Sequence, residues 1–391
     1  MTTQELTNQY IANTYARFPV TFTRGEGSRL WDDTGKEYID LGSGIAVNTL
    51  GLADSGWAET VAAQLRALAH SSNLYYTQPA AKLAQALCER SGMQNVFFSN
   101  SGAEANECMI KCARKYAADK WGENVRPVIV SLENSFHGRT LATLAATGQA
   151  DFHHDFGPFP AGFAHARPND IESLRRQLDE HDGQCCAILL ELVQGEGGVV
   201  ALEQAFVREA AKLAKERELL LLLDEVQTGN GRTGTLFAFE QYDIRPDLVS
   251  TAKGLAGGLP FGATLFGEAV SGTLGPGSHG STFGGNPACA AGALYVLDQL
   301  NDSLLARVRE SGAWLRAKLQ AAPGVLGLTG LGLMLGIKTA RPAKEIAAQC
   351  LAKGVVVLTA KDKVRLLPAL NIPRDLLEEA IDILIACMDG Q

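Results

Sequence analysis

One stretch, Leu219-Leu-Leu-Leu-Leu-Asp-Glu-Val-Gln-Thr-Gly229, decides the fold. Its five consecutive leucines leave no polar face, which is typical of a strand that is buried on both sides of a sheet. The strand ends at Asp224 and Glu225. Because ligands of open α/β sheets bind beyond the carboxyl ends of the strands, functional side chains are expected at this edge.

Short apolar strands and amphipathic helices alternate on both sides of this stretch. We expect strands over residues 95–99, 127–132, 187–193, 219–223, 247–251 and 262–266. We expect helices over residues 80–89, 103–116, 170–178 and 204–218. This alternation predicts an α/β fold with a mostly parallel central sheet that helices cover on both faces.

The two ends of the chain differ from this pattern. Residues 28–40 alternate around the turn Asp32-Asp-Thr-Gly35, which predicts a hairpin. Near the other end we expect a helical stretch over residues 287–319, short strands near Leu326, Leu333, Val355 and Val364, and a last helix over residues 374–388. A chain of 391 residues exceeds what one core usually supports. We therefore expect a segment 1–50 that packs with a small α+β domain 276–391, and a large domain 51–275.

Composition and charge exclude several classes of protein. Hydrophobic residues make up 46% of the chain and charged residues 20%, which is ordinary for a globular protein. The net charge of −8 argues against a nucleic-acid partner, which would need a basic face. No apolar run is long enough to span a membrane, and the first ten residues do not resemble a signal peptide. The eight cysteines form no Cys-x-x-Cys pair, so we expect a cytoplasmic protein with reduced thiols and no metal site.

Residues 95–106 predict a strand, a tight turn and a helix, in that order. Ser101 and Glu104 have the spacing of a capping box. The amides of Gly102 and Ala103, together with the helix dipole, would suit a phosphate. The alternative is a plain helix cap that binds no ligand.

Two further strand ends carry ionisable residues. A carboxylate at Asp224 would be costly to bury unless it met a cation or hydrogen-bond donors, and a protonated pyridine nitrogen would serve. Lys253 stands among small residues after the strand 247–251. A desolvated lysine has a lowered pKa, which frees its amine to form an imine. The alternatives are an aspartate that caps a turn and a lysine on the surface.

Gly229-Asn-Gly-Arg-Thr-Gly234 has the spacing of a dinucleotide-binding loop. No convincing helix follows it, and no acidic residue ends a second strand about 20 residues further on. Nicotinamide binding is therefore disfavoured. Hydrolase chemistry has no support either, since no serine stands in a Gly-x-Ser-x-Gly elbow.

Taken together, these segments resemble the class III, or ω-amino-acid, aminotransferases. The resemblance runs from Asn13-Thr-Tyr-Ala-Arg-Phe-Pro19 to Arg365-Leu-Leu-Pro-Ala-Leu-Asn-Ile372. It implies pyridoxal-phosphate fold type I, with a smaller α+β domain built from the N- and C-terminal segments. It also implies pyridoxal 5′-phosphate as the cofactor and a ping-pong reaction.

The resemblance assigns roles to residues by position. It makes Lys253 the lysine that forms the imine and then carries the proton, and Asp224 the partner of the pyridine nitrogen. The remaining cofactor contacts that it implies are Ser101, Gly102 and Ala103 for the phosphate, Phe136 and Val226 for the two ring faces, and Gln227 for the phenolic oxygen. Thr282 resembles the residue by which a neighbouring subunit completes the phosphate site, which implies a homodimer with shared active sites.

The substrate residues follow from the same resemblance. Arg139 matches the arginine that takes the distal carboxylate, and Arg365 the one that takes the α-carboxylate of glutamate or 2-oxoglutarate. Glu196 resembles the carboxylate that neutralises Arg365 when no α-carboxylate is present, since an unpaired buried arginine would be costly. Tyr15 and residues 73–76 are expected at the pocket mouth, and Ser281 near the substrate.

Two departures from the family pattern bear on the substrate and on packing. Where ornithine aminotransferases have a tyrosine before Ala-Val-Asn, this chain has Gly44-Ile-Ala-Val-Asn48, which favours an acylated donor. We expect N-acetylornithine as donor and 2-oxoglutarate as acceptor, a step of arginine biosynthesis. Succinylornithine, ornithine or 4-aminobutyrate are alternative donors, and an aminomutase or a non-catalytic relative are less favoured classes. Residues 51–57 lack the family's Gly-His-x-His-Pro, which leaves local packing open.

Overall fold

The computed structural model describes residues 1–122 and 124–390. Its centre is a sheet of seven strands. In spatial order these are β4 (Asn95–Ser99), β12 (Gly262–Phe266), β11 (Leu248–Thr251), β10 (Leu220–Asp224), β7 (Cys185–Leu190), β5 (Val128–Leu132) and β6 (Phe163–Ala166). Five of them, from β11 to β6, pair in parallel. Only β12 is reversed, since it is antiparallel to both β11 and β4. The predicted mostly parallel sheet is confirmed.

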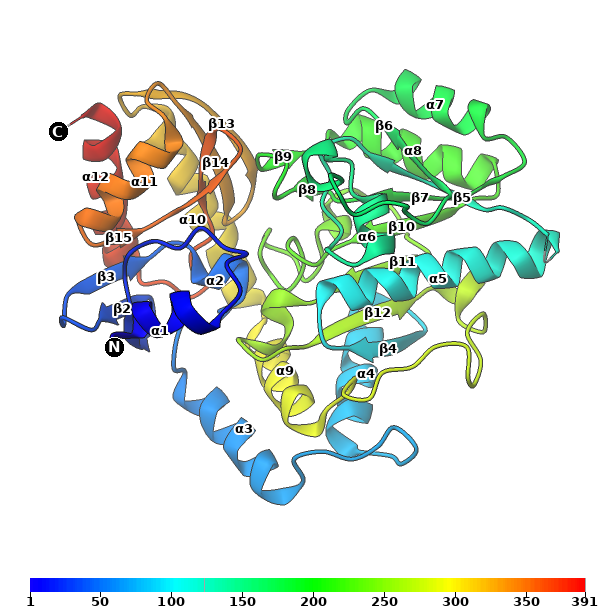
Figure 1. Ribbon diagram of the computed structural model, residues 1–391, viewed down its shortest axis with the longest axis horizontal. Coiled ribbons are helices and arrows are strands. Elements are labelled where there is room, and N and C mark those ends of the chain that lie inside the picture. The colour runs from blue at the N-terminus through cyan, green and yellow to red at the C-terminus, as the bar shows by residue number, and fades with distance from the viewer. Residues whose placement is uncertain (123, 391) are drawn as a thin grey trace.

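Helices cover this sheet on both faces (Figure 1). Helix α5 (Gly102–Trp121) packs across one face, against β4, β7, β10, β11 and β12. Three helices pack on the other: α4 (Gln78–Ser91), α7 (Ile171–Glu180) and α8 (Gln204–Glu216). In β10, Leu220 and Leu222 belong to the core under α5, and Leu221 and Leu223 to the core on the opposite face. Two buried faces explain the uninterrupted run of leucines.

A second lobe is built from both ends of the chain. One of its sheets has the order β13 (Val325–Leu331), β14 (Met334–Thr339), β17 (Lys363–Leu366) and β16 (Leu358–Ala360). The other has the order β1 (Phe22–Glu26), β2 (Arg29–Asp32), β3 (Glu37–Asp40) and β15 (Val355–Val356). The helices of this lobe are α10 (Asp302–Gln320), α11 (Ala343–Ala352) and α12 (Arg374–Asp389). Because β3 pairs with β15, the N-terminal hairpin is part of the C-terminal lobe.

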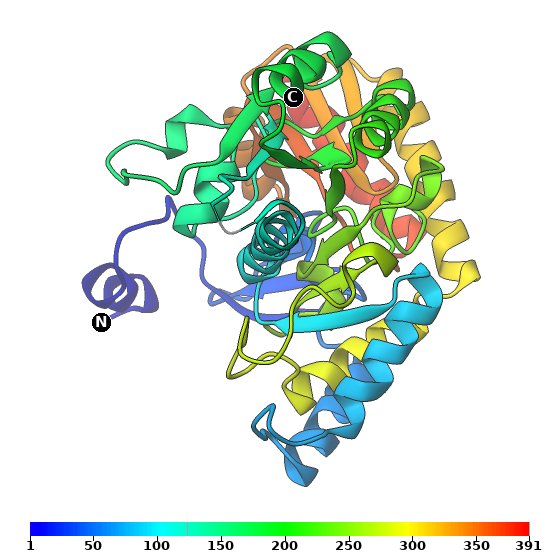
Figure 2. The same ribbon diagram turned by 90° about the vertical axis from the view of Figure 1, so that its right-hand side faces the viewer.

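Smaller elements connect the two lobes or stand apart from them. Helix α1 (Thr3–Tyr10) has no buried residue and stands away from the body of the molecule (Figure 2). The other short elements are α2 (Ser43–Ala46), α6 (Leu141–Ala146), β8 (Val193–Gln194), β9 (Val200–Ala201) and the 3-10 turns η1 (Ala150–Phe152), η2 (Ala238–Gln241), η3 (Lys253–Ala256) and η4 (Glu268–Val270). Helix α9 (Pro287–Gln299) lies between α3 (Ser55–Ala67) and α4 at the base of the large lobe.

The structure differs from the sequence-based expectations in several places. Strand β6 and helices α1, α3 and α11 were not expected. The helical stretch over residues 287–319 is two helices, because Asn301 begins α10 by accepting a hydrogen bond from the Leu304 amide. Helix α9 packs on α3 and α4, inside the large lobe. The boundary expected at residue 276 would assign α9 to the small domain, whereas the helices that α9 contacts lie within residues 51–275.

Two statements follow for the described part of the chain as a whole. Within residues 1–122 and 124–390, no helix combines the length and the apolar character needed to cross a membrane. All eight cysteines are free thiols. Six of them are buried and two are partly buried.

Candidate active site

A cavity of about 250 Å³ opens at the carboxyl ends of β10, β7 and β11. Its lining brings together residues that lie up to 151 positions apart in the sequence. They are Gly102, Ala103, Asn106, Phe136, His137, Gly138, Arg139, Glu191, Glu196, Asp224, Val226, Gln227 and Lys253. Nine of these were predicted as site residues, and they come from five separate segments. The cavity lies where the strand ends of an α/β sheet predict a ligand.

Asp224 ends β10 and is only 5% exposed. Its Oδ2 accepts hydrogen bonds from Asn106 Nδ2 at 2.7 Å and from His137 Nδ1 at 2.8 Å. Its Oδ1 accepts one from the Val226 amide at 3.0 Å. These donors offset the cost of burying the carboxylate. One further donor on the cavity side, such as a protonated ring nitrogen, would complete its coordination.

Asn106 fixes this arrangement from helix α5. Its Oδ1 accepts the Ser250 hydroxyl at 2.6 Å, and its Nδ2 donates both to Asp224 and to the His137 carbonyl at 2.7 Å. All the polar atoms of the amide therefore have partners, so the Nδ2 end must face Asp224. The helix that lies over the sheet thus positions the carboxylate at the sheet's edge.

A second buried carboxyl group, Glu191, lies at the end of β7. It accepts hydrogen bonds from the Phe136 amide at 2.8 Å and from the Gly195 amide at 3.4 Å. Burial raises the pKa of Glu191 to about 7, while His137 acts in the opposite direction. The ring Nε2 of His137 is buried and has no hydrogen-bond partner among the described residues. One imidazole thus lies between two buried carboxyl groups at the floor of the cavity.

Lys253 follows β11 and begins the 3-10 turn η3 with a positive φ of 43°. Burial lowers the pKa of its amine, more than the nearby Glu196 and Asp224 carboxylates raise it. The side chain is partly exposed to the cavity that it lines. A lysine with a lowered pKa at a cavity wall can attack an aldehyde and later accept or give a proton.

The N-terminus of α5 forms another wall of the cavity. Ser101 Oγ caps the helix by accepting the Glu104 amide at 3.2 Å. In a capping box the Glu104 carboxylate would accept the Ser101 amide. Here it accepts the Asn100 amide instead, at 2.6 Å. The first-turn amides of Gly102 and Ala103 have no partner inside the helix, which suits a phosphate. Gly102 leaves no room for a side chain, because its Cβ would lie 2.7 Å from Val226 Cγ1.

Gln227 is the clearest sign that this cavity binds a ligand. Its Oε1 is buried and unpaired among the described residues, although buried polar atoms nearly always have partners. Gly195 allows the side chain to lie there, since a Cβ at that position would come within 2.7 Å of Oε1. The site therefore offers a carboxylate for a ring nitrogen, an amide for a ring substituent, amides for a phosphate and a lysine. This set fits pyridoxal 5′-phosphate.

One arginine lines the cavity and a second pairs with the lining residue Glu196. Arg365, 3% exposed on β17, donates from its guanidinium to Glu196 Oε1 at 2.7 Å. Arg139 is exposed, and its guanidinium carbon lies 4.0 Å from the Phe152 ring centroid and 5.4 Å from that of Phe136. Within the described residues Arg139 has no ion pair. One arginine is thus buried and paired, and the other is held by aromatic rings and open to a ligand.

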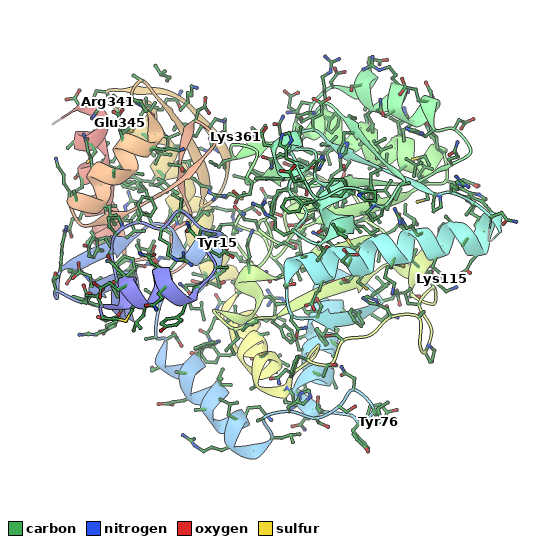
Figure 3. The ribbon with its side chains drawn as sticks, viewed as in Figure 1. Tyr15, Tyr76, Lys115, Arg341, Glu345 and Lys361 are labelled. Atoms are coloured by element: carbon green, nitrogen blue, oxygen red, sulfur yellow. The ribbon has the colours of Figure 1, made fainter. Side chains whose placement is uncertain are left out.

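Five predicted site residues do not line the cavity: Ser101, Ser281, Thr282, Arg365 and Tyr15. Ser101 directly precedes the lining residue Gly102, and Arg365 pairs with the lining residue Glu196. Ser281 Oγ accepts Asn100 Nδ2 at 3.1 Å, and Thr282 is exposed. Tyr15 is 70% exposed, on the N-terminal segment that faces the space between the lobes (Figure 3).

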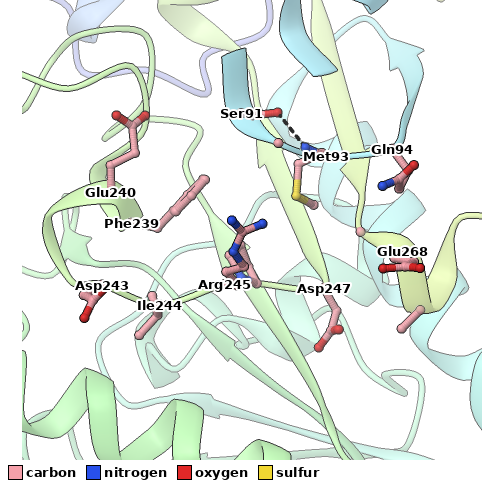
Figure 4. A pocket seen from close by; sticks show the side chains of 14 residues that line it. Ser91, Met93, Gln94, Phe239, Glu240, Asp243, Ile244, Arg245, Asp247 and Glu268 are labelled. Carbon is pink, nitrogen blue, oxygen red and sulfur yellow. Dashed lines mark hydrogen bonds between the residues drawn. The ribbon is translucent and has the colours of Figure 1, made fainter. Parts of the chain in front are cut away.

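A larger cavity, of about 660 Å³, lies at the opposite end of the strands. Figure 4 shows its lining, in which Arg245 stands among the acidic residues Glu240, Asp243, Asp247 and Glu268. It contains no lysine, and no unpaired buried side chain points into it. Size alone therefore does not identify the site.

The sequence-based interpretation missed Asn106, His137, Glu191 and Ser250. Two of them had a usable signal. Glu191 directly follows a fully apolar strand, as Asp224 does, and Asn106 faces the sheet one turn into a helix with a buried side. His137 and Ser250 are recognised only once the segments are folded together.

Comparison with known proteins places these residues in context. The profile of the family described as “Aminotransferase class-III” matches residues 10–388. The chain is 50% identical over 383 residues to the acetylornithine aminotransferase of Haemophilus ducreyi, covering 97% of each chain. It is 45% identical over 378 residues to that of Aquifex aeolicus, covering 96% of this chain and 98% of the relative.

Solved structures show the same likeness. The N-acetylornithine aminotransferase of Stenotrophomonas maltophilia superimposes with a TM-score of 0.82 at 33% identity, covering 99% of this chain and 98% of that one. The ornithine aminotransferase of Toxoplasma gondii ME49 gives a TM-score of 0.94 at 29% identity, covering 100% and 96%.

We predict that His137→Leu weakens cofactor binding by roughly tenfold or more, because it removes a charge-assisted hydrogen bond to Asp224. His137→Asn, which keeps a nitrogen donor near the Nδ1 position, is expected to retain most of the affinity. The measurement is the dissociation constant of pyridoxal phosphate for the apoprotein, with the absorbance of the bound cofactor followed against pH. Equal affinities for both variants would contradict this role of the imidazole.

Proposed function

The chain belongs to the class-III aminotransferases, and from this premise we propose that it moves the δ-amino group of N-acetylornithine to 2-oxoglutarate. The products are N-acetylglutamate 5-semialdehyde and glutamate, a step of arginine biosynthesis in the cytoplasm. The identity of 45–50% to acetylornithine aminotransferases over nearly the full chain supports this donor. The enzyme is a pyridoxal-phosphate-dependent transaminase.

The ion pair between Arg365 and Glu196 is the observation that carries the proposal. Arg365 is buried, whereas the Glu196 side chain is 32% exposed and lines the cavity. Glu196 can therefore turn away when a dicarboxylate offers its own α-carboxylate to Arg365, and return when an ω-amine is bound. A buried arginine is costly without a partner, so one of the two anions must always pair with it. One pocket can thereby accept two different substrates in turn.

The chain's own residues divide the remaining work. The cofactor supplies an aldehyde that takes up the amino group and a ring that stabilises the electron pair left when a proton is removed. Lys253 Nζ holds that proton and returns it, which its lowered pKa favours. Asp224 would hold the ring nitrogen in its protonated form, and Gln227, whose Oε1 is buried and unpaired among the described residues, would contact a ring substituent. Arg139 binds the carboxylate at the far end of the substrate.

The turn at residues 43–46 bears on the donor. Ser43, Gly44, Ile45 and Ala46 all have positive φ values, between 47° and 66°. This left-handed turn leaves the Ile45 side chain 41% exposed. An isoleucine offers an apolar surface and no hydrogen-bonding hydroxyl, in keeping with an acylated rather than a free amino group. The alternative amino donors to N-acetylornithine remain succinylornithine, ornithine and 4-aminobutyrate.

We also propose a homodimer in which each subunit completes the other's site through Thr282. Large apolar side chains are exposed at the end of α3, on the α3–α4 connection and on the segment before α9: Leu65 51%, Leu68 44%, Leu74 87%, Tyr75 71% and Phe283 59%. Asn73 Nδ2 joins the two segments through the Ser281 and Gly284 carbonyls, each at 2.9 Å. Figure 3 shows Tyr76 projecting from the same connection. Patches of this kind are typical of interfaces.

The shared site makes a prediction for mixed subunits. Lys253→Ala and Thr282→Val subunits, each of low activity alone, are refolded together. A heterodimer then holds one site with an intact lysine from one chain and an intact threonine from the other. Activity above that of both parents is expected if Thr282 acts across the interface. No gain, with heterodimers verified by mass, would place Thr282 in its own subunit's site or outside catalysis.

The donor is tested by single half-reactions. Purified protein with its cofactor is mixed separately with N-acetylornithine, N-succinylornithine, ornithine and 4-aminobutyrate, and the absorbance of the bound cofactor is followed. N-acetylornithine is expected to react fastest, and 2-oxoglutarate to restore the starting spectrum. Lys253→Ala should bind cofactor without turnover. A faster reaction with another amine would overturn the donor assignment while leaving the transamination chemistry in place.

We call the exchangeable ion pair of Arg365 and Glu196 the gate. It predicts opposite effects for substitutions of these two residues. Arg365→Met should raise the half-saturating concentration of 2-oxoglutarate by about tenfold to a hundredfold, the worth of a charged hydrogen-bonded contact, and leave the amine half-reaction nearly unchanged. Glu196→Gln should instead impair the amine half-reaction, since Arg365 then lacks its anion. Equal losses in both half-reactions for either variant would rule out the gate.

A further inference from the structure

The loop Gly229–Gly234 resembles a dinucleotide-binding loop in sequence but has no part in the proposed function. It follows the strand that carries Asp224 and consists of turns, with only the short η2 after it. Its residues are buried, and its neighbours belong to both lobes. At Gly231, for example, a Cβ would lie 2.8 Å from Leu370 and 2.9 Å from Leu300. The glycine spacing here serves close packing between lobes.

Arg232, at the centre of the loop, is 3% exposed. Its guanidinium Nη1 donates to the Pro368 carbonyl at 2.5 Å and to the Leu333 carbonyl at 3.2 Å. In return, the Leu333 amide donates to the Arg232 carbonyl at 3.0 Å. No carboxylate pairs with Arg232 within residues 1–122 and 124–390. A buried guanidinium without a counter-ion is costly, and the hydrogen bonds to these two carbonyls of the second lobe offset that cost.

Pro368 lies three residues after Arg365 on the same extended segment. The bond from Arg232 therefore holds the segment that carries the carboxylate-binding arginine. Asn230, two residues before Arg232, binds the segment that leads to Lys253. Its Nδ2 donates to Thr251 Oγ1 at 2.9 Å and to the Ala252 carbonyl at 3.1 Å. Ala252 directly precedes Lys253. Three consecutive loop residues thus connect the backbone at Lys253 with the backbone beyond Arg365.

A second connection runs through Thr49. Its hydroxyl donates to the Gly254 carbonyl at 2.7 Å, and its carbonyl accepts the Leu370 amide at 2.9 Å. The Ala252 carbonyl, before Lys253, and the Gly254 carbonyl, after it, are therefore tied to the segment after Arg365, the first by the loop and the second by Thr49. This closed set of hydrogen bonds fixes the distance between the Lys253 and Arg365 side chains.

We propose that Arg232 is a positioning residue that fixes Arg365 relative to Lys253, so that a dicarboxylate bound at Arg365 meets the reacting centre. The inference rests on the proposed function, because it takes Arg365 as the site of the α-carboxylate. It assigns the loop a role in substrate selection. Because Lys253 and Asp224 act in both half-reactions and Arg365 in only one, loss of Arg232 falls mainly on the dicarboxylate half.

The test compares Arg232→Met with Arg307→Met in the full-length holoenzyme. Arg307, on α10, donates to the carbonyls of Asn371 at 3.1 Å and Ile372 at 2.6 Å. It is a matched control, since it binds the same C-terminal segment by the same chemistry but from within the second lobe. Each half-reaction is followed by cofactor absorbance against the concentration of one substrate. Binding of a non-reacting dicarboxylate, maleate, is measured alongside.

For Arg232→Met, half-saturation by 2-oxoglutarate and the dissociation constant of maleate should rise by about tenfold to a hundredfold, since a displacement near 1 Å can cost a factor of a hundred. The amine half-reaction should stay within about twofold, and Arg307→Met should change neither. Arg232→Lys, which keeps a charge and a donor, should lie between wild type and Arg232→Met. If Arg232→Met does not fold, the same ordering is required of Arg232→Lys against Arg307→Lys.

Three outcomes separate the possible failures. Equal loss in both half-reactions, or equal effects of Arg232→Met and Arg307→Met, would reduce Arg232 to general stability and overturn the inference. Sensitivity to Arg365→Met without sensitivity to Arg232→Met would overturn the inference alone. If Arg365→Met changes neither half-saturation by 2-oxoglutarate nor the dissociation constant of maleate, the proposed function on which the inference rests is overturned.

Discussion

The burial of the Asp224 carboxylate is the constraint on which the rest of the site depends. A charge at the end of a strand that is covered on both faces has little access to water, so the protein must supply donors for it. It does so from three directions: helix α5 through Asn106, the connection after β5 through His137, and the following turn through the Val226 amide. Each donor also fixes the segment that carries it. Solvating one carboxylate therefore places α5, the 135–140 segment and the β10 turn around a common cavity.

Much of this could be predicted from the sequence, because the relevant signals are local. Five leucines that end in a carboxylate identify a central strand, and a serine three residues before a glutamate identifies the start of α5. The partners of Asp224 could not be found in this way. Asn106 and His137 are 118 and 87 residues away from it, and nothing in their own segments marks them as donors to a carboxylate. The predicted capping box shows a related limit, since the Glu104 carboxylate accepts the Asn100 amide and the Ser101 hydroxyl rather than the Ser101 amide.

The two lobes meet where the substrate must be chosen, and their bonding explains how that choice can be local. The segment after Arg365 is held by Arg232 and by the Thr49 carbonyl, while Glu196 stands on a turn and is partly open to solvent. Movement of one carboxylate side chain costs far less than the breaking of several buried hydrogen bonds. Exchange between two classes of substrate therefore needs only rotation of Glu196, with the lobes kept in place.

The loop Gly229–Gly234 shows why a glycine pattern does not define a function. In a dinucleotide-binding loop the glycines lead into a helix, whose free amides meet a pyrophosphate. Here the chain continues in turns, and the space that the glycines leave is filled by Leu370 and Leu300 of the chain itself. Because the glycines have no side chains, side chains of the protein itself pack against this loop where a dinucleotide-binding loop would contact a ligand. The element that follows the glycines distinguishes the two cases. The backbone amides in the first turn of a helix have no partner within the helix and can bind an anion. The amides of consecutive turns are already hydrogen-bonded, as those of Gly231, Arg232 and Gly234 are.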